Sequence, residues 1–208
     1  MAILIEHPFV QHKLAIVRDV ATGHKKFREI SKEITQFICY EALKHIKMKE
    51  VIVETPVAPA TCHKIDTDLV VVPILRAGVG MLDGILDLAP TARVGFVGLY
   101  RDEETKEPVT YYERFPRQIK GGTCIVIDPM LATGGSTVAA LDLLKEHGAG
   151  NIIVICIVTC PEGIELVESA HPDVKIYAAA IDERLNEKKY IVPGLGDAGD
   201  RLFGTAHY

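Results

Sequence analysis

The feature that most constrains this 208-residue chain is a series of short, nearly unbroken apolar runs. They are LVVVPIL (69–75), RVGFVGLY (93–100), CIVIDPM (124–130), NIIVICIVTC (151–160) and KIYAAAI (175–181). A strand with one wet face alternates apolar and polar residues, whereas an unbroken apolar run is typical of a strand buried on both faces of a parallel sheet. We therefore predict a central parallel sheet that is covered on both sides.

The segments between these runs have the spacing of helices. Apolar residues in 136–147 recur every three or four positions, and Gly148 follows as a stop signal. The segment 161–170 begins with Pro161. Proline is favoured at the first position of a helix, so a helix is predicted to start there. Upstream, residues 25–46 carry the apolar stripe of an amphipathic helix. Alternating strands and helices predict an α/β fold, a doubly wound and mostly parallel sheet flanked by helices.

The length predicts a single domain over residues 1–208, since domains average roughly 150 residues. Two segments depart from the alternation. Residues 102–116 include EPVTYYERFP, whose polar–apolar alternation predicts a projecting β-arm. A two-stranded arm is marginally stable alone, so we expect it to pack on another copy in a homodimer or larger homo-oligomer. The Gly-rich tail, 182–208, carries no helix signal.

Charge and composition exclude several classes of protein. The net charge of −5 argues against a nucleic-acid partner, because such proteins neutralise phosphates with a basic surface. An anionic ligand must then be held by a few local groups. The five cysteines form no C-x-x-C pair, and the histidines show no zinc-binding spacing. We find neither a signal peptide nor an apolar run near the roughly 18 residues of a membrane span. These features predict a cytoplasmic protein with no membrane partner.

The stretch TCIVIDPMLATGGST places a carboxylate, Asp128, at the end of a predicted buried strand. In doubly wound sheets, ligands bind at the carboxyl ends of the strands. Gly134 and Gly135 allow close backbone approach, and the amides of 132–136 converge at the start of a helix, which favours anions. The alternative is a plain strand-to-helix turn with Ser136 as N-cap. The first interpretation predicts a phosphate-binding loop, but neither a P-loop nor a dinucleotide fingerprint is present.

The same stretch resembles the phosphoribosyl-diphosphate loop of type I phosphoribosyltransferases. Most of that class have two adjacent acids here, whereas this chain has Asp128-Pro129, the form seen in uracil phosphoribosyltransferases. PILRAG (73–78), GLYRDEET (98–105) and YIVPGLGDAGDRLFGT (190–205) also resemble that family's motifs, in the same order. The resemblance implies a glycosyltransferase of pyrimidine salvage. It would transfer the 5-phosphoribosyl group from 5-phosphoribosyl 1-diphosphate (PRPP) to N1 of uracil, giving UMP and diphosphate.

The resemblance also implies which residues bind PRPP. Arg76 and Arg101 would contact the diphosphate, and a cis peptide is expected near Arg76–Ala77. Asp128 would accept hydrogen bonds from the ribose hydroxyls, and 132–136 would hold the 5′-phosphate. The full implied set is Arg76, Arg101, Asp128, Pro129, Met130, Leu131, Ala132, Thr133, Gly134, Gly135, Ser136 and Asp197, with Arg76, Asp128 and Asp197 as the catalytic residues.

In that family the tail, 182–208, forms a hood over the sheet edge. The resemblance implies that Ile191, Gly196, Asp197 and Ala198 bind uracil, mostly through main-chain groups. Fixed hydrogen-bonding groups discriminate between bases better than an apolar slot. Asp197 would touch PRPP or its metal, or help to deprotonate N1, and Tyr190 would pack beside the sugar.

The implied cofactor is Mg²⁺, carried by the diphosphate of the substrate. Because Pro129 replaces the usual second acid, we expect no ion fixed on the protein, but one bridged by water to Asp197. The resemblance leaves open whether GTP activates this chain, as it does some relatives.

Two other interpretations remain. A purine or orotate phosphoribosyltransferase would share the fold, but Asp128-Pro129 and the tail motif count against it. An RNA-binding regulator of pyrimidine genes would also share it, but the net charge and the missing second acid count against that class.

Overall fold

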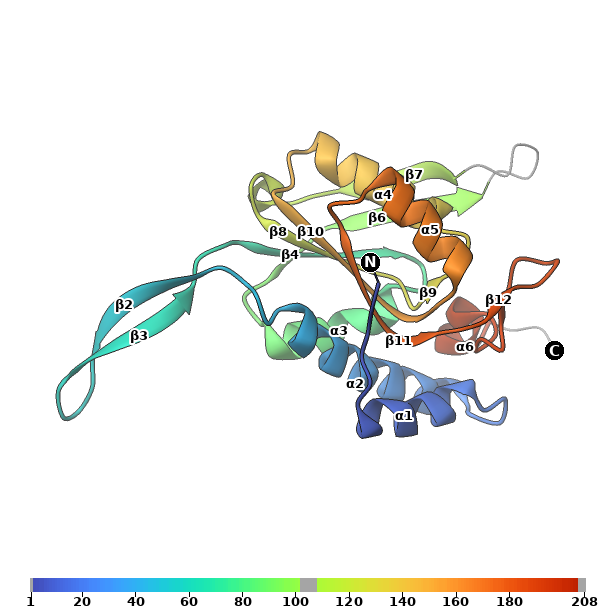
Figure 1. Cartoon of the computed structure of the whole chain (residues 1–208), viewed down its shortest axis with the longest axis horizontal. Coiled ribbons are helices and arrows are strands. Elements are labelled where there is room, and N and C mark those ends of the chain that lie inside the picture. Colours follow the sequence, from blue (N-terminus) through green and yellow to red (C-terminus); the bar gives the residue numbers. More distant parts are fainter. Residues whose placement is uncertain (1, 102–107, 206–208) are drawn as a thin grey trace.

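The computed structural model describes residues 2–101 and 108–205 and shows a central sheet between two layers of helices (Figure 1). The α-helices are α1 (Pro8–Arg18), α2 (His24–Ala42), α3 (Val79–Leu88), α4 (Gly135–Glu146), α5 (Pro161–Ala170) and α6 (Ala198–Phe203). The strands are β1 (Ile3–Leu4), β2 (Met48–Glu54), β3 (Pro59–Ile65), β4 (Leu69–Leu75), β5 (Arg93–Val94), β6 (Phe96–Arg101), β7 (Pro108–Arg114), β8 (Thr123–Ile127), β9 (Met130–Leu131), β10 (Asn151–Thr159), β11 (Lys175–Ile181), β12 (Arg184–Leu185) and β13 (Ile191–Val192).

The central sheet has the order β1-β11-β10-β8-β4-β6-β7, with β5 beside β4 and β9 beside β10. The pairs from β1 to β6 are parallel, and β7 pairs antiparallel with β6 at the edge. The α/β prediction, a mostly parallel sheet flanked by helices, is therefore confirmed.

The unbroken apolar runs arise because the sheet is buried on both faces. Successive residues of a strand point to opposite sides. In β8, Cys124 and Val126 belong to the core beneath α4 and α5, whereas Ile125 and Ile127 belong to the core shared with α1, α2 and α3. Figure 1 shows these two helix layers on opposite sides of the sheet.

The predicted helices between the strands are present. The segment 161–170 coincides with α5, and 136–147 differs from α4 by one residue at each end. The segment 25–46 is α2, but the helix ends at Ala42 because the chain then turns toward β2.

The described part of the segment predicted to project, 108–116, does not stand apart from the body. The described part of 102–116 contains β7, which belongs to the central sheet, while 102–107 lies outside the described residues. The element that projects is the antiparallel pair β2–β3, called here the β2–β3 arm (Figure 1). Its turn is closed by Thr55, whose hydroxyl donates to the Ala58 carbonyl at 2.7 Å.

The tail is more ordered than its sequence suggests. It contains the short antiparallel pair β12–β13 and the helix α6, although its sequence carries no helix signal. A six-residue helix is too short for a periodicity signal, and it forms because Leu202 is fully buried in the core. Within the described residues, none of the helices combines the length and apolar character that a membrane crossing requires.

Candidate active site

Parallel strands bring their carboxyl ends to one edge of the sheet, and the candidate residues follow several of these ends. Arg76 follows β4, Asp128 follows β8, and Arg101 is the last residue of β6. The Arg76 loop lies directly against the end of β8. A Cβ added to Gly78 would come within 2.4 Å of the Ile127 carbonyl oxygen, so only glycine allows this approach.

The loop after Asp128 delivers the chain into α4. Gly134 is the N-cap residue of α4 in a left-handed conformation, with φ of 85°, and as a glycine it has no side chain that could cap the helix. The first amides of a helix lack intrahelical partners and carry the positive end of its dipole. The amino end of α4 is therefore available for an anionic ligand.

A cavity of about 290 Å³, called here the loop cavity, opens at this helix end. The loop 128–137 forms one wall, and the turn between β12 and β13 forms another. Its lining residues are Asp128, Met130, Leu131, Ala132, Thr133, Gly134, Ser136, Thr137, Lys188, Lys189, Tyr190 and Asp197.

A second cavity of about 220 Å³, called here the hood cavity, continues from the loop cavity beneath the tail. The two share Met130, Ala132, Lys189, Tyr190 and Asp197. The remaining lining residues of the hood cavity are Ala77, Ile191, Gly196, Ala198 and Gly199. The sequence-predicted residues Tyr190, Ile191, Gly196, Asp197 and Ala198 thus come together around one space that adjoins Asp128.

Two predicted residues of the loop do not line either cavity. Pro129 is buried, and its carbonyl accepts hydrogen bonds from the amides of Ile157 and Val158 at 3.1 and 3.0 Å. Gly135 is the first residue of α4 and is partly buried. Pro129 therefore anchors the loop to β10, at the position where most of the class has a second acid.

Asp128 is the most perturbed acid of the site. Burial raises the pKa of Asp128 to about 7, and the negative charge of Asp197 adds to this rise. The Met130 amide, which donates to Oδ1 of Asp128 at 3.3 Å, opposes it. Perturbed acids in a cleft are typical of functional sites.

Arg76 lies at the rim of the site. Its Nη2 is 3.4 Å from Oδ1 of Asp200, and its side chain is 61% exposed, so this ion pair is weak and the guanidinium is free to meet a ligand. The peptide between Leu75 and Arg76 is cis, one bond before the expected position. An added Cβ on Gly199 would lie 3.3 Å from Oδ1 of Asp197 and 3.6 Å from Nη2 of Arg76, so the tail closes over this loop.

Arg101 ends β6 at the same edge of the sheet, but its side chain lies outside the described part of the structure, as does the acidic segment that follows it.

Sequence reasoning missed Lys188 and Lys189, which border the loop cavity from the β12–β13 turn. Lys189 has a positive φ of 64° and also lines the hood cavity. The adjacent lysines in NEKKY, in a segment expected to cover a phosphate site, were the available signal.

The donor set of the site suits a cation carried by the substrate. Among the described residues, no group of three or more histidine, cysteine, aspartate or glutamate side chains could hold a metal. The two carboxylates of Asp128 and Asp197 border the loop cavity. Oxygen donors in this number fit Mg²⁺, which binds proteins through one or two carboxylates, water and substrate phosphates.

Comparisons with known proteins agree on a single family. The family model described as uracil phosphoribosyltransferase matches residues 4–205. The uracil phosphoribosyltransferase of Halalkalibacterium halodurans is 57% identical over 203 residues, covering 97% of each chain. That of Dictyoglomus thermophilum is 56% identical over 206 residues, covering 99% of this chain and all of the relative.

Solved structures give the same result at the level of the fold. The AQ2163 protein from Aquifex aeolicus superposes with a TM-score of 0.94 at 40% identity, over the full length of both chains. An adenine phosphoribosyl transferase from Trypanosoma brucei shares the fold, with a TM-score of 0.58 at 13% identity, covering 90% of this chain and 86% of that one.

Proposed function

The chain belongs to the uracil phosphoribosyltransferase family, and from this premise we propose that the loop cavity binds PRPP and that the hood cavity binds uracil. The reaction transfers the 5-phosphoribosyl group from PRPP to N1 of uracil and gives UMP and diphosphate, a step of pyrimidine salvage. The observation that carries the assignment of the cavities is the amino end of α4, which has glycine at its N-cap position and borders the loop cavity between Asp128 and the tail.

In this proposal the 5′-phosphate lies at the amino end of α4. The amides of 132–136 donate to its oxygens, and the helix dipole favours its charge. Lys188 and Lys189, across the loop cavity, add positive charge near the same ligand. Local groups thus hold an anion on a protein whose net charge is −5.

Asp128 accepts hydrogen bonds from the ribose hydroxyls. Asp128 directly follows β8 and lines the loop cavity, which adjoins the hood cavity. A charged acceptor beside the ribose also favours the positive charge that develops at C1 as the bond to diphosphate breaks. Asp197, which borders both cavities, lies where it can contact PRPP or help to remove the N1 proton.

Arg76 and Arg101 bind the departing diphosphate. The support for Arg76 is its exposed guanidinium at the strand edge, and the support for Arg101 is its position at the end of β6. Guanidinium groups bind phosphate oxygens in pairs. Asp128 and Asp197, the two carboxylates that line the loop cavity, would hold Mg²⁺ through its water shell, and the ion would neutralise charge on the diphosphate.

Uracil binds in the hood cavity through the main chain of Ile191, Gly196 and Ala198. Main-chain donors and acceptors can match O2, N3–H and O4 of uracil, whereas cytosine would leave some of them unpaired. Tyr190, which is 46% exposed and lines both cavities, packs beside the sugar.

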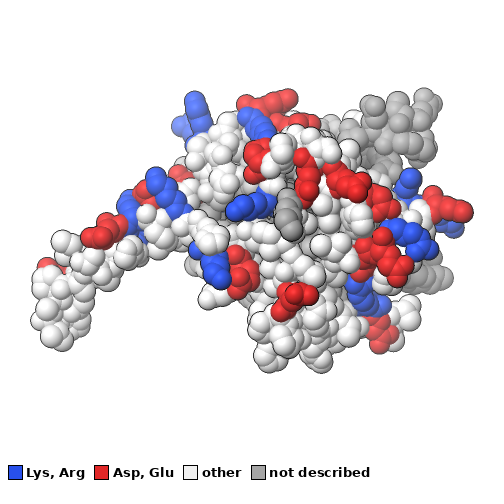
Figure 2. Space-filling model, viewed as in Figure 1, with Lys and Arg blue, Asp and Glu red and all other residues white. Residues whose placement is uncertain are grey.

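We further propose that the protein is a cytoplasmic homo-oligomer. The support for the oligomer is the β2–β3 arm, which carries exposed apolar side chains such as Ile52 and Val57, at 75% and 94% exposure. Figure 2 shows that the far end of this arm is almost free of charged side chains. Activation by GTP is proposed from the resemblance alone, because it occurs in some relatives.

The test is an assay with radiolabelled uracil, PRPP and Mg²⁺, with cytosine, orotate and hypoxanthine as competitors. We expect labelled UMP, weak competition by each base, and loss of product when EDTA removes the metal. Strong competition by orotate or hypoxanthine would contradict the base assignment, and full activity in EDTA would contradict the role of Mg²⁺. A parallel series with added GTP tests the activation.

A further inference from the structure

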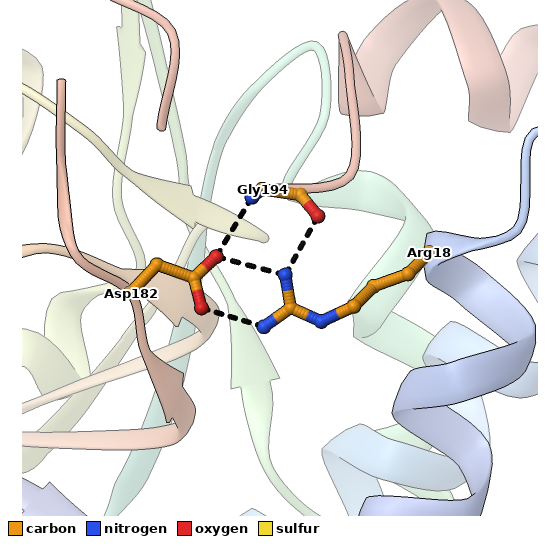
Figure 3. A network of polar contacts seen from close by, with 3 residues as sticks. All are labelled: Arg18, Asp182 and Gly194. Atoms are coloured by element: carbon orange, nitrogen blue, oxygen red, sulfur yellow. Dashed lines mark hydrogen bonds and ion pairs between the residues drawn. The ribbon is translucent and has the colours of Figure 1, made fainter. Parts of the chain in front are cut away.

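Arg18, near the start of the chain, forms a closed polar network with Asp182 and Gly194, near its end (Figure 3). Arg18 donates from Nη2 to Oδ1 of Asp182 at 2.6 Å and from Nη1 to Oδ2 at 2.8 Å. The same Nη1 donates to the Gly194 carbonyl at 2.7 Å, and the Gly194 amide donates to Oδ2 of Asp182 at 2.8 Å. Both main-chain polar groups of one tail residue are thus held by one ion pair.

The position of each member follows from the fold. Arg18 is the last residue of α1, and Asp182 comes directly after β11, where its amide donates to the Thr159 carbonyl at 2.7 Å. Gly194 has a φ of 60°, and an added Cβ would lie 2.2 Å from the Ile191 carbonyl oxygen. The turn therefore requires glycine at this position, and Arg18 and Asp182 hold Gly194 through its main-chain amide and carbonyl only.

The network is shielded from water. The side chain of Asp182 is 6% exposed and that of Arg18 is 25% exposed. An arginine–carboxylate pair with two parallel hydrogen bonds is strong and directional, and removing one partner leaves a buried charge without compensation. Such a pair holds the turn in one orientation far more tightly than an exposed ion pair could.

A second arginine holds the next residue of the same turn. Arg201 of α6 donates from Nη1 to the Leu195 carbonyl at 2.8 Å and from Nη2 to the Asp19 carbonyl at 2.6 Å. Its guanidinium also lies over the ring of Phe27, 4.4 Å from the centroid. Gly194 and Leu195 are therefore both anchored to the end of α1 and the start of α2.

This anchored turn joins the two halves of the hood cavity. Ile191 precedes Gly194 by three residues, Gly196 follows it by two, and both line the cavity. Arg18 and Asp182 line neither cavity. They act on the cavity only through the backbone that they hold.

We propose that Arg18 and Asp182 are positioning residues for uracil, fixing the turn that sets the spacing between the main-chain groups of Ile191 and Gly196. This inference rests on the proposed assignment of the hood cavity to uracil. A site that selects a base by main-chain hydrogen bonds depends on backbone placement, because small shifts lengthen several bonds together. The network supplies that placement.

The experiment measures the KM for uracil and the KM for PRPP separately in Asp182→Asn. Asparagine keeps the shape of the aspartate side chain, but an N–H₂ group replaces one of the two accepting oxygens. The N–H group of Arg18 or Gly194 that donated to this oxygen then faces another donor. We expect the KM for uracil to rise about tenfold. This factor corresponds to the free energy of roughly one charge-assisted hydrogen bond. The KM for PRPP should stay within about twofold, and cytosine should become a better competitor.

Two further variants test the geometry. In Arg18→Lys the charge remains but the planar fork is lost, so the KM for uracil should rise less than in Asp182→Asn. The matched control is Asp68→Asn, which breaks another arginine–aspartate pair. Oδ1 of Asp68 lies 2.8 Å from Nη1 of Arg93, and Asp68 directly precedes β4, at the amino end of that strand. This control should leave both KM values unchanged. Arg18→Lys also serves as the test if Asp182→Asn does not fold.

The outcomes separate the inference from the assignment on which it rests. Gly196→Val changes the cavity wall itself, at a φ of 81°, and should also raise the KM for uracil. If Gly196→Val raises that KM but Asp182→Asn and Arg18→Lys leave it unchanged, or raise both KM values equally, the positioning role is wrong. If none of the three changes it, the assignment of uracil to the hood cavity is wrong.

Discussion

Asp128 illustrates, at the scale of one residue, how burial and chemistry are linked in this site. The strand β8 is apolar on both faces, so the acid at its end is partly removed from water before any ligand binds. Burial and the nearby charge of Asp197 hold its pKa near 7. The carboxylate therefore changes its charge within the physiological range, and a cationic or hydrogen-bonding ligand would favour the ionised form.

We predict that Asp128→Asn abolishes the pH dependence that this acid contributes. In the wild type, kcat/KM for PRPP should rise with pH through about 7, as the carboxylate ionises. The variant keeps the shape but not the charge, so its rate should fall about a hundredfold and lose this rise. Steady-state rates from pH 5.5 to about 8.5 check the prediction. An unchanged rate would contradict the role of Asp128 at the ribose.

The same substitution should stabilise the free protein at high pH. The folded-state pKa of about 7 exceeds the ordinary value of 3.8, so between these values the folded state keeps a proton that the unfolded state releases. Stability therefore falls as pH rises toward 7. Asp128→Asn should gain about 1 to 3 kcal/mol over the wild type at pH 8 and nothing near pH 4. Thermal melts measure this, with exposed Asp83→Asn as the control.

The helix α6 is the element that neither length nor periodicity predicts. Six residues cannot form a stable helix alone. Asp197 caps it by accepting from the Asp200 amide at 2.9 Å, Gly204 ends it with a φ of 68°, and Leu202 is fully buried. Packing against α3 is close, since a Cβ added to Gly80 would lie 2.6 Å from Leu202. Asp197, which caps this helix, is also predicted to contact the substrate.

Two substitutions of Asp197 separate these roles. Asparagine caps helices as well as aspartate does, so Asp197→Asn should keep the stability within a few tenths of a kcal/mol. Alanine loses the cap, so Asp197→Ala should cost about 1 kcal/mol of unfolding free energy. Both remove the charge, and both should lower kcat. Urea titrations and initial rates provide the comparison, and full activity in the Asn variant would show that the charge is not used.

At the scale of the whole molecule, the β2–β3 arm stands apart from the body (Figure 1). Its strands pair along their length, from Met48 with Ile65 to Glu54 with Pro59. An isolated two-stranded ribbon is marginally stable in water, and exposed apolar side chains on it favour contact with another chain. The arm, rather than the segment first predicted to project, is therefore the surface proposed to contact a second copy.

We predict that Ile52→Glu weakens self-association. A charge at this 75% exposed position of the arm would have to be buried or left unpaired in the interface, so the dissociation constant should rise at least tenfold, by about 1.4 kcal/mol or more. Light scattering across a concentration series measures the mass against the 22.8 kDa of one chain. The control is Val20→Glu, at a 91% exposed position in the α1–α2 connection.

A wild type that remains a single chain at micromolar concentration would contradict the proposed homo-oligomer. Equal weakening by Ile52→Glu and Val20→Glu would instead show that the arm is not the surface involved.

The sequence by itself determined the sheet and its helix layers. Strands such as β4 and β11 are buried on both faces, so nearly every residue must be apolar, and the signal does not depend on long-range contacts. The bounds of both elements match the predicted runs. The signal for the loop after Asp128 is also local, because the glycines of the loop and the helix that follows lie within one short stretch of sequence.

Only the tertiary structure decided which segment projects and how the tail is held in place. The β2–β3 arm has no buried face to give a pattern, and α6 forms because the body buries Leu202. The network of Arg18, Asp182 and Gly194 joins residues up to 176 positions apart. No local spacing can predict such a contact, because it depends on where the sheet brings the end of α1 and the end of β11 together.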